Sequence, residues 1–156
     1  MKRASKAMLI GLLAAVAAMP ASAPAQNSSR QERVRVGPTV PPPPAGMGQV
    51  VFYRSSRMGA LISCRVHENG QVVNRLPPGK YFIQQTTPGV HEYSVRSEST
   101  DKLRVEVEEG ETQYVRCAIG MGIGVGRPNL SPQTREDFDR RGEGLDLMPP
   151  YVPDND

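Results

Sequence analysis

The sequence contains no tryptophan, only two cysteines and two histidines, and no long hydrophobic run. A transmembrane helix needs about 20 mostly apolar residues, whereas the longest apolar stretch, Met8 to Met19, has 12. The cysteines and histidines show no C-x-x-C or H-x-x-x-H spacing, so we expect neither a zinc site nor another cofactor. Without tryptophan, the chain also lacks the aromatic side chain best suited to stacking on sugars.

The N-terminus has the three parts of a secretory signal peptide. Lys2, Arg3 and Lys6 form a basic region, the apolar stretch follows, and Ala23-Pro24-Ala25 supplies the small residues that a signal peptidase reads. We expect residues 1–25 to be removed; the alternative is an uncleaved anchor. No cysteine near the cleavage site could carry a lipid. The prediction is a periplasmic or secreted protein with no stable membrane span after cleavage.

Removal of the signal peptide changes the charge argument. The formal net charge of +3 equals the three basic residues that the signal carries, so residues 26–156 have no net charge. The mature chain therefore gives no reason to expect nucleic acid as a partner. Residues 131–156 contain three arginines and seven acidic residues. This acidic tail either lies against the more basic remainder or only keeps the protein in solution.

The chain divides into a linker, a β-rich block and a tail. Residues 26–46 are polar and then rich in proline, and Pro41 to Pro44 favour a stiff polyproline II spacer. Residues 47–126 alternate short apolar runs with turn dipeptides. Residues 127–156 hold a short helix and a loose acidic end. The helix is expected to start with Ser131 as its N-cap and Pro132 at its first position, and to continue through Thr134 to Arg141.

The β-rich block predicts about seven strands. Gln49 to Arg54 is a dense run of β-formers that is apolar on both faces, which is typical of an interior strand. Asn69-Gly70 predicts a hairpin, because a type I′ turn needs positive φ at both central residues. Leu103 to Glu108 alternates apolar and charged residues, as a strand with one wet face does. The fold class is therefore all-β, a small antiparallel sandwich of the prealbumin or immunoglobulin type.

Cys64 and Cys117 each fall on the apolar face of their predicted strand. In an oxidising compartment, two such residues in one small domain most often form a disulfide. The alternatives are two buried free thiols, or a reactive cysteine assisted by His67 or His91, although a reactive thiol needs an exposed and electropositive setting.

A second unusual segment has glycine at every other position: Gly120, Gly122, Gly124 and Gly126. The spacing fails the G-x-G-x-x-G dinucleotide pattern in both possible registers. Alternating glycines instead leave one face of a strand without side chains, which lets another surface approach closely. The segment is either a flexible strand end or a docking surface.

Several stretches resemble the bacterial domain-of-unknown-function family 2846. Residues 48–54 (GQVVFYR) resemble its opening strand, residues 69–91 its succession of turns, and residues 110–116 (GETQYVR) its closing strand. The likeness covers about residues 46–120. It implies a small exported β-sandwich module. The succession of turns is also similar to that of surface-layer β modules and prealbumin-like domains, which mostly bind or space rather than catalyse. Some members of the family carry a lipid at the N-terminus, for which this chain has no cysteine.

No paired acids, nucleophile or base stand out, so we expect a non-enzymatic module of the cell envelope that acts through protein contacts. The alternative is a module that binds envelope glycans through exposed tyrosines. The residues expected on the interaction surface are Arg54, Arg57, Tyr53, Tyr81, Tyr114 and the four alternating glycines.

Overall fold

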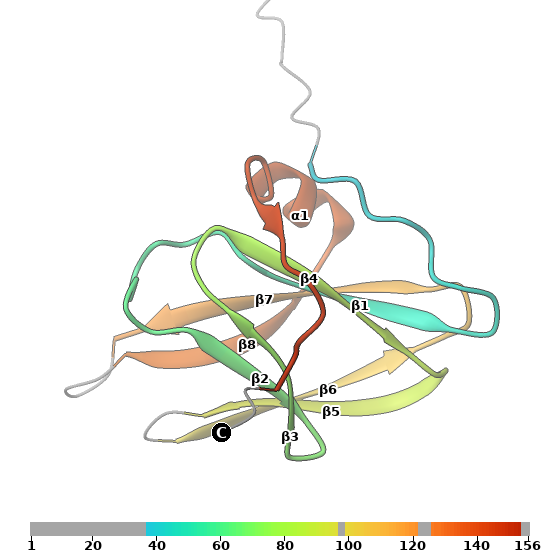
Figure 1. The fold of residues 1–156 in the computed structure, drawn as a ribbon, viewed down its shortest axis with the longest axis horizontal. Helices are drawn as coiled ribbons and strands as arrows, with labels where there is room; N and C mark the ends of the chain where they lie inside the picture. Colours follow the sequence, from blue (N-terminus) through green and yellow to red (C-terminus); the bar gives the residue numbers. More distant parts are fainter. Residues whose placement is uncertain (1–36, 97–98, 122–125, 154–156) are drawn as a thin grey trace, which may run out of the picture. The chain divides into compact units, whose positions relative to one another are not determined.

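The computed structural model describes residues 37–96, 99–121 and 126–153. The predicted signal peptide, residues 26–36 of the linker, Gly122 and Gly124 lie outside the described residues. Within them the chain forms nine strands and one short helix, and the strands make two sheets that pack face to face (Figure 1). The expected all-β sandwich is confirmed, with nine strands instead of about seven.

The first sheet has five strands in the order β8-β7-β1-β4-β9, and the second has four in the order β3-β2-β5-β6. The strands are β1 (Gly48–Arg54), β2 (Cys64–Glu68), β3 (Gln71–Leu76), β4 (Lys80–Thr86), β5 (Gly89–Arg96), β6 (Thr100–Val107), β7 (Thr112–Gly120), β8 (Arg127–Gln133) and β9 (Asp146–Leu147). Most neighbours are antiparallel, but β1 pairs with β7, and β4 with β9, in parallel.

Strand β1 lies inside its sheet between β4 and β7, and all seven of its residues are buried. Val50 and Phe52 face the core between the sheets. Val51 and Tyr53 face the opposite side, where helix α1 (Arg135–Arg141) covers them. The interior strand predicted from its two apolar faces is confirmed, and each face has its own apolar cluster.

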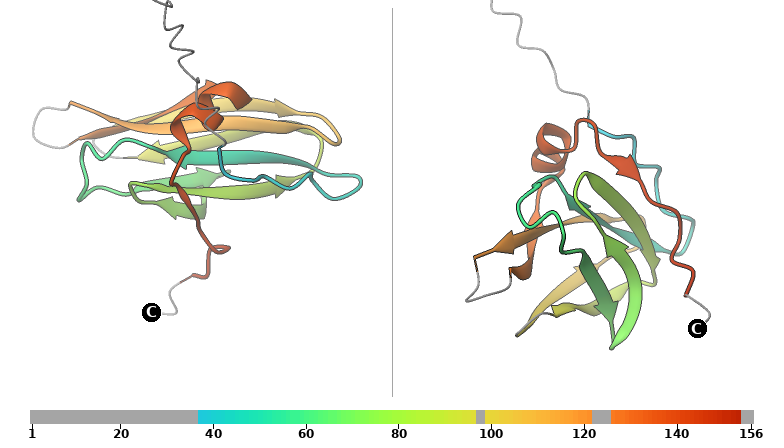
Figure 2. Two further views of the ribbon diagram at one scale, coloured as in Figure 1. Left: turned by 90° about the horizontal axis from the view of Figure 1, so that it is seen from above. Right: turned by 60° about the vertical axis from the view of Figure 1, so that its left-hand side comes forward.

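The core between the sheets is closed by aromatic packing and by a disulfide. The ring of Phe52 lies 4.9 Å from those of both Phe82 and Tyr93. Cys64 of β2 is bonded to Cys117 of β7, with 6.6 Å between their Cα atoms. The disulfide therefore joins one sheet to the other across the core. The two layers lie one above the other in Figure 1, and Figure 2 shows them from above and from the side.

The hairpin at Asn69-Gly70 is confirmed by the backbone, since φ is 50° at Asn69 and 85° at Gly70. The helix begins later than expected. Ser131 and Pro132 belong to strand β8, and Thr134 is the N-cap, whose Oγ1 accepts a hydrogen bond from the Asp137 amide (3.2 Å). A proline is tolerated in β8 because this strand is an edge of its sheet.

Both ends of the described chain are held more closely than the sequence indicates. Gln49 donates a side-chain hydrogen bond to the Pro41 carbonyl (2.7 Å), so the proline-rich segment lies along the domain. At the other end, the Met148 amide donates to the Tyr81 carbonyl (2.8 Å), which extends the pairing between β4 and β9. Strands β8 and β9 thus carry the sandwich beyond residue 126.

Candidate functional site

Arg54, which the sequence analysis placed on an interaction surface, is fully buried. Its guanidinium group donates hydrogen bonds to carbonyl oxygens: Nη1 to Ile62 and Leu76, and Nη2 to Met58 (2.9 Å) and Gly59 (2.8 Å). No carboxylate among the described residues pairs with it, and burial lowers its pKa. The surface assignment was wrong: Arg54 fastens the loop of residues 55–63, which follows β1.

That loop presents large apolar side chains to solvent. Met58 is 60% exposed and Leu61 is fully exposed, and Met121, just after β7, is 93% exposed. The loop, the end of β7 and the start of β8 lie at the same end of the sandwich (Figure 1). We call Met58, Leu61 and Met121 the apolar tip. A methionine or leucine in this position adapts readily to an apolar partner surface.

Two glycines bring the segments of the apolar tip together. A Cβ atom at Gly59 would lie 2.8 Å from Cγ2 of Ile119, and one at Gly126 would lie 2.9 Å from Cδ1 of Ile62. The sequence predicted that another surface could approach the glycine segment closely. Such an approach occurs at Gly126, but the surface is the protein's own Ile62 and not a partner. Gly120 is partly buried at the end of β7.

The two segments that carry the apolar tip contain arginines but no acidic residue, although Asp101 of β6 lies beside the second segment, where its Oδ2 accepts a hydrogen bond from the Leu130 amide (2.8 Å). Neither residues 55–63 nor residues 120–130 contain an aspartate or glutamate, whereas Arg57 is exposed in the first segment and Arg127 in the second. A partner surface with apolar and acidic groups would complement this end of the protein.

The three tyrosines expected on an exposed face are buried instead. Tyr53, Tyr81 and Tyr114 surround Phe138 of α1, with ring centroids 5.1, 5.7 and 5.2 Å from it. The outer face of the first sheet is covered by the helix, so these rings cannot stack on a sugar. The prediction that these tyrosines form an exposed surface for glycan binding was wrong.

A charged cluster joins α1 to the sheet. Asp137 is buried, and its Oδ2 accepts a hydrogen bond from the Tyr53 hydroxyl (2.6 Å). Its Oδ1 accepts from Nε of Arg141 (2.8 Å) and from Nη2 of Arg140. Burial alone would raise the pKa of Asp137, but the hydrogen bonds from Tyr53, Arg141 and Arg140 outweigh it and lower the pKa to about 2. Burial and the bond to Asp137 raise the pKa of Tyr53.

The Asp137 cluster predicts a loss of stability in acid. Because the folded pKa of Asp137 lies below its ordinary value of 3.8, its contribution is complete above that value and is lost as the pH falls through about 2. We expect Asp137→Asn to lower the free energy of unfolding by about 1–2 kcal/mol at neutral pH, since solvent screens part of the interaction. Urea unfolding at a series of pH values should show that the difference in unfolding free energy between the wild type and Asp137→Asn, the stability gap, becomes smaller below pH ~4. Asp139→Asn, which leaves the cluster intact, is the control; a gap that does not change with pH would contradict the assignment.

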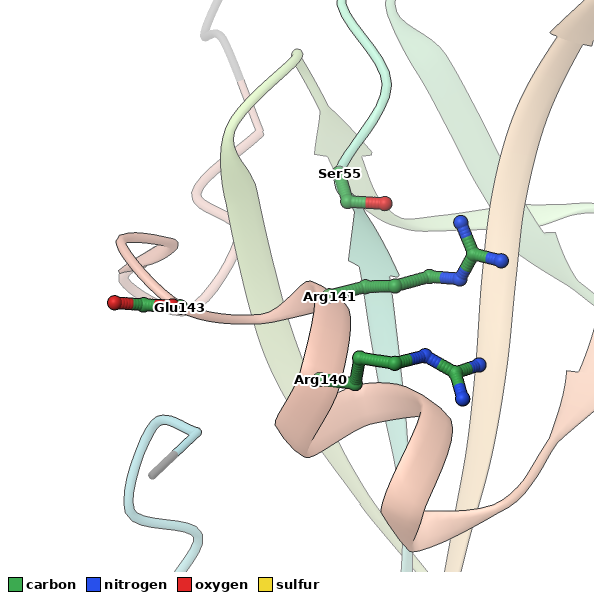
Figure 3. A pocket seen from close by; sticks show the side chains of 4 residues that line it. All are labelled: Ser55, Arg140, Arg141 and Glu143. Carbon is green, nitrogen blue, oxygen red and sulfur yellow. The ribbon is translucent and has the colours of Figure 1, made fainter. Parts of the chain in front are cut away.

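Beside α1, Ser55, Arg140, Arg141 and Glu143 line a shallow hollow of about 490 Å³. Both guanidinium groups extend to the same side of the helix, toward β7, and the Ser55 hydroxyl points to that side as well (Figure 3). The Glu143 side chain points the other way. Sequence reasoning did not find this site, because Ser55 lies far from the arginines in the chain.

Glu68, Thr86 and His91 lie together near the ends of three strands. A carboxylate, a hydroxyl and a histidine are the side chains that an activated nucleophile requires. Nδ1 of His91 lies 2.7 Å from Oε1 of Glu68, and Nε2 lies 2.8 Å from the carbonyl oxygen of Thr87. A carbonyl only accepts, so Nε2 carries a proton while Nδ1 faces the carboxylate. The Thr86 hydroxyl oxygen lies 3.1 Å from Nδ1 and 3.0 Å from Nε2, but each nitrogen also faces a nearer acceptor, the Glu68 carboxylate or the Thr87 carbonyl. The geometry suits a link between strand ends better than an activated nucleophile.

The described residues contain no group of three or more His, Cys, Asp or Glu side chains that could hold a metal ion. A family model described as "Protein of unknown function (DUF2846)" matches residues 44–127. The chain belongs to the DUF2846 family. Comparison with curated proteins and with solved structures found no match. The resemblance carried by the GQVVFYR and GETQYVR stretches is confirmed.

The DUF2846 match separates the two surfaces described above. It contains β1 to β7 with Arg54 and the apolar tip, whereas α1 with Arg140 and Arg141 lies beyond it. No helix in the part of the chain that the structure describes is long and apolar enough to cross a membrane.

Proposed function

We propose that this DUF2846 protein is a non-enzymatic module of the cell envelope that binds another protein through the apolar tip. The observation that carries the proposal is the exposure of Met58, Leu61 and Met121 at one end of the sandwich. Large apolar side chains at a surface cost free energy unless a partner covers them. Their loop is fastened by a buried arginine, so little conformational entropy is lost on binding.

Export through the N-terminal signal peptide is part of the same proposal. The disulfide between Cys64 and Cys117 supports it, because structural disulfides persist in oxidising compartments. The partner we expect is an envelope protein with an apolar contact surface bordered by acidic residues. Glycan binding has less support, because the tyrosines that would stack on sugars are buried.

Site-specific photo-crosslinking in cells tests the proposal. A photoreactive phenylalanine analogue at Leu61 should yield a discrete adduct with one partner, and the same analogue at Val90, which is 63% exposed on β5, should not. Met58→Ser combined with Met121→Ser should greatly reduce the adduct, while stability changes by no more than about 0.5 kcal/mol per substitution. Equal adducts from both positions, or adducts that survive the serine substitutions, would contradict docking at the apolar tip.

A further inference from the structure

The arginines beside α1 have more hydrogen-bond donors than the protein uses. Each guanidinium group carries five N–H donors. Within the described residues, Arg140 donates through Nη2 and Arg141 through Nε, and both bonds end on the same oxygen of Asp137. The two side chains are 62% and 45% exposed. Their remaining donors therefore lie at the surface of the hollow.

The local charge is also unbalanced. The single negative charge of Asp137 faces two arginines, and its lowered pKa keeps it from taking up a proton at neutral pH. Arg116 adds a third positive charge, since it lies beside Tyr53 in the pairing of β1 with β7 and interacts electrostatically with the Tyr53 hydroxyl. Its Nε is buried and has no hydrogen-bond partner in the described part of the chain.

The orientation of the side chains places this charge away from the end of the helix. The C-terminal end of a helix carries partial negative charge, which would oppose an anion. Arg140 and Arg141, however, extend sideways from α1 toward β7, and Glu143 points away from them (Figure 3). The two guanidinium groups are held in this direction by their bonds to Asp137, so they are positioned before any ligand arrives.

We propose that this hollow binds an oxyanion, either a phosphate group or a carboxylate, through Arg140, Arg141 and the Ser55 hydroxyl. A guanidinium group matches either anion because its parallel N–H groups can donate to two oxygens at once. The volume of about 490 Å³ leaves room for an anion that is part of a larger molecule. The site is separate from the apolar tip, although Ser55 begins the loop that carries the tip.

Nuclear magnetic resonance of the arginine Nε–Hε groups tests the site in the chain from residue 26 onward. Inorganic phosphate and acetate are the probes, each added at constant ionic strength against chloride. We expect saturable shifts at Arg140 and Arg141 and none at Arg135, which lies on the same helix and pairs with Asp139. The probe that saturates at lower concentration identifies the ligand as a phosphate group or a carboxylate.

Substitutions assign the binding to these side chains. Arg140→Gln and Arg141→Gln should each weaken binding about tenfold, and each leaves Asp137 one arginine partner. Ser55→Ala does not touch the Asp137 cluster and should weaken binding about threefold; Arg135→Gln should have no effect. Shifts that rise linearly with concentration, or binding that Arg135→Gln weakens as much as Arg141→Gln does, would overturn the proposal.

Discussion

Replacement of Arg54 by methionine should lower the free energy of unfolding by about 3–5 kcal/mol. Methionine fills a similar volume but donates no hydrogen bond. The carbonyl oxygens of Met58, Gly59, Ile62 and Leu76 would lose the hydrogen bond from the guanidinium group, and the first three belong to the loop of residues 55–63. Of these, the Gly59 carbonyl keeps the hydrogen bond from the Ile62 amide. Buried acceptors without a partner cost more than the hydrogen bond itself contributes.

Lysine at position 54 separates the effect of charge from that of shape. It keeps the positive charge but has a single nitrogen that cannot reach carbonyl groups on opposite sides of a planar fork. We therefore expect Arg54→Lys to lose at least about half as much stability as Arg54→Met. Arg57→Met is the matched control, since Arg57 is exposed and should change stability by no more than about 0.5 kcal/mol.

Denaturant unfolding measures these differences, and hydrogen exchange locates them. The Ile62 amide, which bonds to the Gly59 carbonyl (2.9 Å), should lose protection in Arg54→Met before the core strands do. If Arg54→Met unfolds with nearly the wild-type free energy, the carbonyl bonds are not what holds the loop. The same variant should weaken crosslinking from Leu61, because a more mobile loop loses more conformational entropy when it binds.

The strands of the core could be predicted because they obey a simple pattern. The alternation of Leu103 to Glu108 and the turn at Asn69-Gly70 are local signals, and both recur in the structure as β6 and as the β2–β3 hairpin. Strand β8 was not predicted, because proline is unusual in strands and because Ser131-Pro132 resembles the start of a helix. Its prolines, Pro128 and Pro132, are tolerated since β8 has a neighbour on one side only, β7, and edge position is not visible in a local pattern.

The candidate sites could not be predicted because they join residues far apart in the chain. Tyr53 and Asp137 are separated by 84 residues, yet they share a hydrogen bond beneath α1. The sequence does contain one indirect signal: β1 is apolar on both faces, which requires a cover on each. Phe138 is the one strongly apolar residue of the helix, and its side chain packs against the outer face of β1.

The exposure of the tyrosines was mispredicted for the same reason. A tyrosine next to charged residues looks like a surface residue, but its hydroxyl can be buried when a partner such as Asp137 accepts its proton in a hydrogen bond. Arg54 can be buried for a similar reason: its guanidinium group donates hydrogen bonds to backbone carbonyls and needs no acidic partner. A polar side chain can be buried only where the fold supplies its hydrogen-bond partners, and a local sequence pattern does not show them.

Removal of the disulfide should cost about 4 kcal/mol. Cys64 and Cys117 are 53 residues apart in sequence, and the chain-entropy relation for a loop of this length gives that value. The bond is the only disulfide between the two sheets in the described chain, and both cysteines are fully buried. A small domain has a total stability of about 5–15 kcal/mol, so this loss is a large share of it.

Three variants distinguish the cross-link from the packing of its atoms. Cys64→Ala, Cys117→Ala and the double variant should be destabilised by similar amounts, because loss of either sulfur opens the same loop. If the two single effects add in the double variant, side-chain packing and not the cross-link is responsible. Intact mass after alkylation without reduction should show no adduct on the exported wild-type protein. Two adducts would mean that the thiols are free where the protein acts, and the disulfide would then lend no support to export.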